Sequence, residues 1–235
     1  MRALLCLAMP LLLQSQTSGR PSDPISNERI LGLIPNFQTV DDPTIKYQPL
    51  RVRDKWRLFV KESTDPFNFA SAAAGAALSQ IDNDNPKYGY GVKPYLQRFG
   101  AATADLTTQS FFSDAVLASL LREDPRYFRM GKGRSTFRRI GYALSRAIIT
   151  RYDSGRAGFN FSGVIGMGMG IALSDAYYPP QSVGGGELRS RILTSMLGSA
   201  FGNLLPEFWP DIREKFHRKP PAGHDVSSGL SRAGN

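Results

Sequence analysis

An uncharged, glycine-rich window constrains the fold more than any other part of this sequence. Ala157–Ser174 runs for eighteen residues without a charged side chain, and glycine stands at positions 163, 166, 168 and 170. Each glycine costs a helix about 1 kcal/mol relative to alanine, so a helix here needs a compensating gain. Close approach by a neighbouring helix supplies such a gain. We therefore expect a central helix over Asn160–Tyr178, with helices at Pro66–Ile81 and Glu187–Leu205 packed closely against it.

The same window raises the question of a membrane span. Eighteen residues at about 1.5 Å each reach about 27 Å, just short of a hydrocarbon core of about 30 Å. The four glycines and the polar Asn160, Ser162 and Ser174 weaken insertion further. A bundle in water is the first interpretation. A bundle embedded in or lying on a membrane is the alternative, because both media reward close helix packing.

Helical periodicity continues through the rest of the body, from Arg53 onward. Asp65 followed by Pro66, Ser135 and Asn160 are expected N-terminal caps. No alternation typical of strands extends over a comparable length. The sequence predicts an all-α fold, a compact helical bundle of about six or seven helices with close small-residue packing. The expected helices are Asp54–Glu62, Pro66–Ile81, Val92–Leu121, Thr136–Ile149, Asn160–Tyr178, Glu187–Leu205 and Pro206–Phe216. An interruption of Val92–Leu121 near Gly100 is an alternative. In Thr136–Ile149, we expect Phe137, Ile140, Leu144 and Ile148 to face the core.

Both ends of the chain differ in composition from this body. A charged start and an eleven-residue apolar run, Ala3–Leu13, predict a signal peptide over residues 1–19. Five prolines in residues 20–50 predict an extended arm whose apolar patch, Ile30–Phe37, docks on the helical bundle of residues 51–217. Residues 218–235 carry no aromatic side chain and predict a disordered tail.

The scarcity of cysteine and histidine limits the chemistry. Cys6 is the sole cysteine, and the two histidines, His217 and His224, stand near the C-terminus. This removes the usual metal-ligand sets and the nucleophile–histidine arrangements from the body of the chain. We expect no metal site and no cofactor.

A basic region, residues 122–156, is the candidate anion-binding site. It holds ten arginines and lysines against three acids in a chain of net charge +9. Guanidinium groups match phosphate oxygens, so an anionic membrane surface or polysaccharide is the expected partner, and nucleic acid is the least expected one after a signal peptide. A solvated or salt-bridged face is the alternative. The candidate residues are Arg126, Arg129, Lys132, Arg134, Arg138 and Arg139.

Several carboxylates have two interpretations. Glu123, Asp124 and Asp175 are candidates for acid–base catalysis if at least two of them meet in a pocket with arginine. The alternative is structural pairing, because an unpaired buried charge is costly. The candidate members of structural ion pairs are Asp105, Asp114, Asp175, Arg122 and Arg146, with Arg98 as a further partner.

Short motifs spread over residues 28–217 resemble an uncharacterised family of bacterial secreted or envelope proteins. They include Ile34-Pro35-Asn36-Phe37, Glu123-Asp124-Pro125-Arg126-Tyr127-Phe128, Ala176-Tyr177-Tyr178-Pro179 and Glu207-Phe208-Trp209-Pro210-Asp211. The resemblance implies export and a helical fold. It implies no activity and no catalytic residue.

These observations favour an exported, periplasmic or envelope-associated protein that is not an enzyme. An envelope hydrolase or lipid-modifying enzyme built on the carboxylates is one alternative, and an integral membrane bundle is another. The sequence leaves the ligand and the oligomeric state open.

Overall fold

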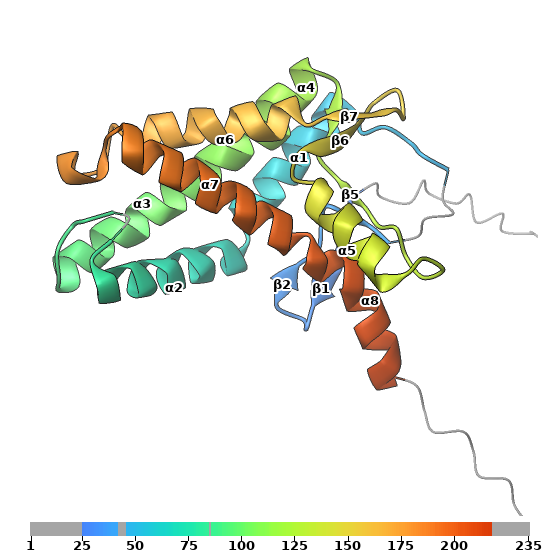
Figure 1. Cartoon of the computed structure of the whole chain (residues 1–235), viewed down its shortest axis with the longest axis horizontal. Helices are drawn as coiled ribbons and strands as arrows, with labels where there is room; N and C mark the ends of the chain where they lie inside the picture. The colour runs from blue at the N-terminus through green and yellow to red at the C-terminus, as the bar shows by residue number, and fades with distance from the viewer. Residues whose placement is uncertain (1–24, 42–45, 85, 218–235) are drawn as a thin grey trace, which may run out of the picture.

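The computed structural model describes residues 25–41, 46–84 and 86–217, and most of these residues are helical (Figure 1). The predicted signal peptide and the predicted disordered tail lie outside the described residues. The helices are α1 (Val52–Ser63), α2 (Pro66–Asp82), α3 (Val92–Ser110), a π-helical segment η1 (Phe111–Leu117), α4 (Ala118–Leu120), α5 (Thr136–Ser145), α6 (Phe161–Ser174), a 3₁₀ turn η2 (Pro180–Ser182), α7 (Gly185–Gly202) and α8 (Leu204–His217).

The three predicted caps form. Asp65 accepts a hydrogen bond from Phe67 N at 2.9 Å, Ser135 from Arg138 N at 3.4 Å, and Asn160 from Gly163 N at 2.8 Å. Each side chain satisfies a backbone donor that the first helical turn leaves unpaired. Local sequence therefore sets the starts of α2, α5 and α6.

The predicted interruption near Gly100 is absent. Helix α3 passes through Gly100 and continues through the π-helical segment η1 into α4. The irregular part lies at Phe111–Leu117 instead, where Trp56, Phe59 and Phe111 make edge-to-face contacts at 5.8–6.3 Å. The backbone widens where bulky aromatic rings pack, and not where glycine lowers helix propensity.

The all-α prediction is incomplete, because three small sheets accompany the helices. Strands β1 (Arg29–Ile30) and β2 (Ile34–Pro35) form a hairpin, and β3 (Thr39–Val40) pairs in parallel with β5 (Tyr127–Phe128). Strands β4 (Glu123–Asp124), β6 (Ile149–Tyr152) and β7 (Ala157–Phe159) form an antiparallel sheet in the order β4-β6-β7. These strands are two to four residues long, too short to show an alternating pattern. Ile149 starts a strand, so the predicted helix Thr136–Ile149 is too long.

The N-terminal arm contributes part of the core. Ile25, Phe37 and Leu50 pack with Leu58 of α1 in one buried cluster. In the predicted docking patch, Ile30 is also buried, whereas Leu31 and Leu33 at the hairpin turn are each 69% exposed.

Helix α6 packs closely on the α3–η1 rod through two of its glycines. A Cβ atom at Gly166 would lie 2.6 Å from Ser113 N, and one at Gly170 would lie 2.7 Å from Gln109 Cγ. Helix α7 also packs on α6, whereas α2 packs chiefly on α3 (Figure 1). The expectation that Pro66–Ile81 packs on the glycine-rich helix is therefore wrong.

The glycine-rich helix is not enclosed by its neighbours. Ile165, Met169 and Leu173 stand four residues apart on α6 and are each 40–46% exposed. Helix α7 contains no buried residue. Within the described residues, no helix combines the length and the hydropathy that crossing a membrane requires.

Candidate functional site

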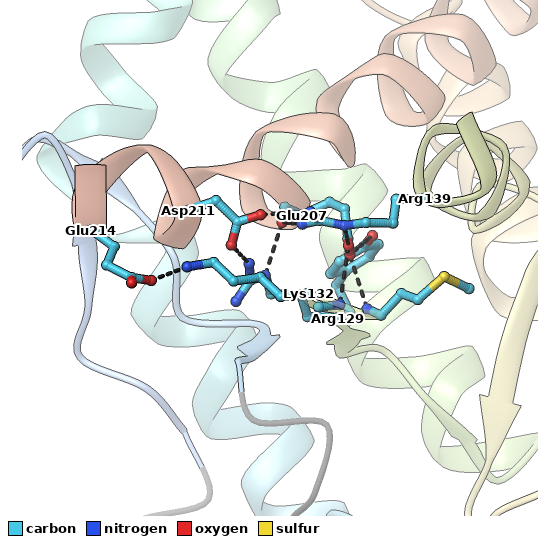
Figure 2. Close-up of polar contacts among 9 residues, drawn as sticks. Arg129, Lys132, Arg139, Glu207, Asp211 and Glu214 are labelled. Carbon is cyan, nitrogen blue, oxygen red and sulfur yellow. Dashed lines mark hydrogen bonds and ion pairs between the residues drawn. The ribbon is translucent and has the colours of Figure 1, made fainter. Parts of the chain in front are cut away.

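A buried ion-pair network joins the basic region to helix α8 (Figure 2). Glu207 of α8 is fully buried and stands at its centre. Its Oε1 accepts from Arg139 Nε at 2.7 Å and Gly131 N at 3.2 Å, and its Oε2 accepts from the Tyr127 hydroxyl at 2.8 Å and Met130 N at 3.0 Å. Four donors offset the cost of removing the carboxylate from water.

The next turns of α8 extend this network. Asp211 pairs with Arg139, at 2.5 Å from Nη1, and with Arg129. Burial alone would raise the pKa of Asp211, but hydrogen bonds from the two guanidinium groups and their positive charges hold it below its usual value. Farther along α8, Glu214 pairs with Lys132 at an exposed position.

Most of the candidate anion-binding residues are therefore already paired with acids. Arg129, Lys132 and Arg139 pair with α8, and Arg126 pairs with Asp124 at 2.7 Å. The salt-bridged alternative holds for these four. The α8 acids that pair with Arg129, Lys132 and Arg139 lie 68 to 82 residues away from them in the sequence, so a window over residues 122–156 could not reveal these pairs.

Arg134 and Arg138 differ from the other four candidates. Both are exposed, and no carboxylate among the described residues pairs with either guanidinium. Phe137 stands between them and is 87% exposed. The prediction that Phe137 faces the core is wrong, because the buried face of α5 carries Arg139 and Ala143, and Phe137 lies off that face. We call Arg134, Phe137 and Arg138 the α5 tip.

The three candidate catalytic carboxylates do not meet in one pocket. Glu123 and Asp124 are adjacent in strand β4, so their side chains leave opposite faces. Glu123 Oε2 accepts from Ser162 N at 2.9 Å, whereas Asp124 binds Arg126 and the Tyr47 hydroxyl. Asp175 pairs with Arg191 at 2.8 Å, beyond the opposite end of α6.

The other expected ion pairs do not form. Asp105 accepts from the hydroxyls of Tyr177 and Tyr178 at 2.6 and 2.5 Å, and burial raises its pKa. Arg122 is exposed, and Arg146 stacks over the Tyr142 ring. Arg98 is buried and binds the end of α2 and the following loop, through Asn83 Oδ1 and Gly89 O at 2.6 Å.

The structure instead joins two acids that sequence reasoning did not pair. Gln38 Nε2 donates to Glu62 Oε2 at 2.6 Å and lies 3.4 Å from Asp114 Oδ2. Burial, followed by the nearby Asp114 charge, raises the pKa of Glu62 to about 8, and burial raises that of Asp114 to about 6. We call Glu62 and Asp114 the carboxyl pair. Its members come from α1 and η1, and no local pattern links them.

Comparisons of the chain with protein-family models, with curated proteins and with solved structures found no match. The family resemblance therefore stays a prediction.

Proposed function

We propose that this is a non-enzymatic, exported protein that attaches peripherally to an anionic membrane through the α5 tip. The observation that carries the proposal is the position of Phe137, 87% exposed between two exposed arginines that have no acid partner among the described residues. Export depends on the predicted signal peptide at residues 1–19.

The composition of the α5 tip suits a lipid surface better than a polysaccharide. Arginine forks bind lipid phosphates, and a phenylalanine ring gains free energy by leaving water for the boundary between headgroups and acyl chains. Gly131 and Gly133, at φ +71° and +101°, shape the turn that precedes the tip. Basic residues near an anionic surface contribute about 1 kcal/mol each, so two arginines give weak, reversible attachment.

Co-sedimentation with vesicles tests this attachment. Wild-type protein is expected to sediment with vesicles that contain phosphatidylglycerol, and less with pure phosphatidylcholine. Binding is expected to fall as salt rises, because free ions screen the arginines. The double variant Arg134→Ala/Arg138→Ala and the single variant Phe137→Ala should each weaken binding several-fold.

A matched control removes the same charge elsewhere. Arg51→Ala/Arg53→Ala changes two exposed arginines at the start of α1 and should bind as the wild type does. Equal loss in both double variants would show that net charge alone drives binding. Salt-independent binding, or none, would contradict the proposal.

A further inference from the structure

Two adjoining cavities lie between the N-terminal hairpin, the start of α6 and the α7–α8 junction. The first, of about 90 Å³, has polar walls that include Asp114, Arg146, Thr150, Asn160 and Ser162, and we call it the polar cavity. The second, of about 320 Å³, has an apolar part of its wall formed by Ile30, Ile34, Phe37, Leu205 and Pro206, and we call it the hairpin cavity. Gln38, Tyr127 and Asn203 line both.

Arg146 lines the polar cavity and is half-buried. No hydrogen bond or ion pair from the described residues reaches its guanidinium, which lies over the Tyr142 ring at 5.5 Å. Burial lowers the pKa of Arg146, which shows that its charge is partly removed from water. A guanidinium in such a place gains from a bound anion.

The other polar groups around Arg146 already have partners. Arg126 binds both oxygens of Asp124 and the Gln48 carbonyl. The Tyr127 hydroxyl donates to Glu207, and the Tyr142 hydroxyl donates to Phe128 O at 2.6 Å. Asp114 is held by Ser113 and Gln38. Arg146 is therefore the group available to an incoming anion.

The hairpin cavity offers no charge to a ligand at neutral pH. Glu62 is the acid in its wall, and a pKa of about 8 keeps that carboxyl protonated there. The remaining walls combine apolar side chains, such as Ile30, Ile34 and Leu205, with uncharged polar ones, namely Asn36, Gln38, Thr39, Tyr127 and Asn203. The volume is at the lower end of the range for small-molecule sites.

We propose that the two cavities together bind a small amphipathic carboxylic acid, with its carboxylate on Arg146 and its apolar tail in the hairpin cavity. An arginine fork matches a carboxylate, and the apolar walls reward removal of the tail from water. This site is separate from the α5 tip and does not depend on membrane attachment.

Calorimetric titration of the full chain with octanoate, acetate and octanol tests the site. Octanoate should bind saturably at one site. Acetate, which has the charge without the tail, and octanol, which has the tail without the charge, should each bind at least tenfold more weakly. From acetate through butanoate to octanoate, affinity should rise about threefold to fourfold for each added methylene.

Substitutions test whether the carboxylate of octanoate binds Arg146. Arg146→Gln should weaken octanoate binding at least tenfold, whereas Arg51→Gln, which removes an exposed charge on α1, should not. Circular dichroism should show that each variant is folded. If Arg146→Gln does not fold, Asn203→Asp supplies the second test, because a carboxylate lining both cavities should repel octanoate.

Four results would overturn the proposal. Equal binding of acetate and octanoate would indicate a simple oxyanion site without a tail compartment. Equal binding of octanol and octanoate would show that the carboxylate does not contribute to binding. Unchanged octanoate binding in both cavity variants would show that Arg146 does not bind the carboxylate. Absence of saturable octanoate binding by the wild type would exclude the site.

Discussion

At the residue scale, the glycines of α6 divide by the face on which they lie. Gly166 meets the backbone of Ser113, with an added Cβ 2.6 Å from N and 2.7 Å from Cα, whereas nothing lies within 4 Å of a Cβ at Gly168. Backbone atoms cannot move aside as a flexible side chain can. Gly166 is therefore required by packing, and Gly168 only lowers helix propensity.

This difference predicts opposite effects of one substitution. Gly166→Ala should destabilise the fold by roughly 1–3 kcal/mol, because it overpacks the contact with η1. Gly168→Ala should stabilise it by about 0.5–1 kcal/mol, because alanine is the better helix former and meets open space. Urea denaturation measures both. A neutral or stabilising Gly166→Ala would show that α6 and η1 are not in close contact.

The carboxyl pair gives stability a particular pH dependence. The pKa of Glu62 rises from 4.5 to about 8 on folding, and that of Asp114 rises from 3.8 to about 6. The folded state therefore binds more protons than the unfolded state across this window, and the free energy of unfolding falls as pH rises through it.

Glu62→Gln should flatten that dependence. The variant should gain stability over the wild type as pH rises from 5 to 9, since it has no charge to bury at position 62. Denaturation at several pH values measures the gain. The control Asp82→Asn removes an exposed acid on α2 and should follow the wild-type profile. A wild-type profile in Glu62→Gln would show that Glu62 does not carry the raised pKa.

At the element scale, α8 holds the irregular part of the fold together. Its acids bind side chains and backbone amides between Tyr127 and Arg139, a segment that is mostly loop and so offers few backbone hydrogen bonds of its own. The position of α5, and with it of the α5 tip, depends on this helix.

Two acids on α8 allow the stability contribution of a buried ion pair to be compared with that of an exposed one. Glu207→Gln leaves the buried Arg139 guanidinium facing a neutral amide and should cost about 3–5 kcal/mol, because a broken buried pair leaves an uncompensated charge. Glu214→Gln breaks an exposed pair with Lys132 and should cost about 1 kcal/mol or less. Thermal and urea unfolding compare the two. If both variants lost the same free energy of unfolding, Glu207 would have to be in contact with water.

At the scale of the whole molecule, basic and apolar surface are distributed differently from the sequence expectation. In the basic region, Arg126, Arg129, Lys132 and Arg139 are paired with acids. Arg134 and Arg138 are exposed at the α5 tip, and Arg122 and Arg156 are exposed outside it. Apolar side chains lie open to solvent along α6 and α7, including Leu193, Leu197 and Phe201, which repeat every four residues. The proposed attachment through the α5 tip therefore predicts that the salt dependence of vesicle binding follows Arg134 and Arg138, and not the net charge of +9.

The sequence by itself determined most helix positions and their starts. Helical periodicity, and short-range caps such as Asp65, Ser135 and Asn160, act within a few residues and can be recognised locally. The small sheets escaped prediction because a strand of two to four residues has no measurable alternation.

Tertiary structure alone decided which charges are available. Arg134 and Arg138 look alike in sequence to Arg129, Lys132 and Arg139, and only the approach of α8 distinguishes the two sets. The glycine-rich window shows the same limit. Its composition indicated close packing, but which helix touches Gly166 and which face stays open depend on contacts between residues distant in the chain. Such contacts form only when the whole fold is assembled, so no local pattern records them.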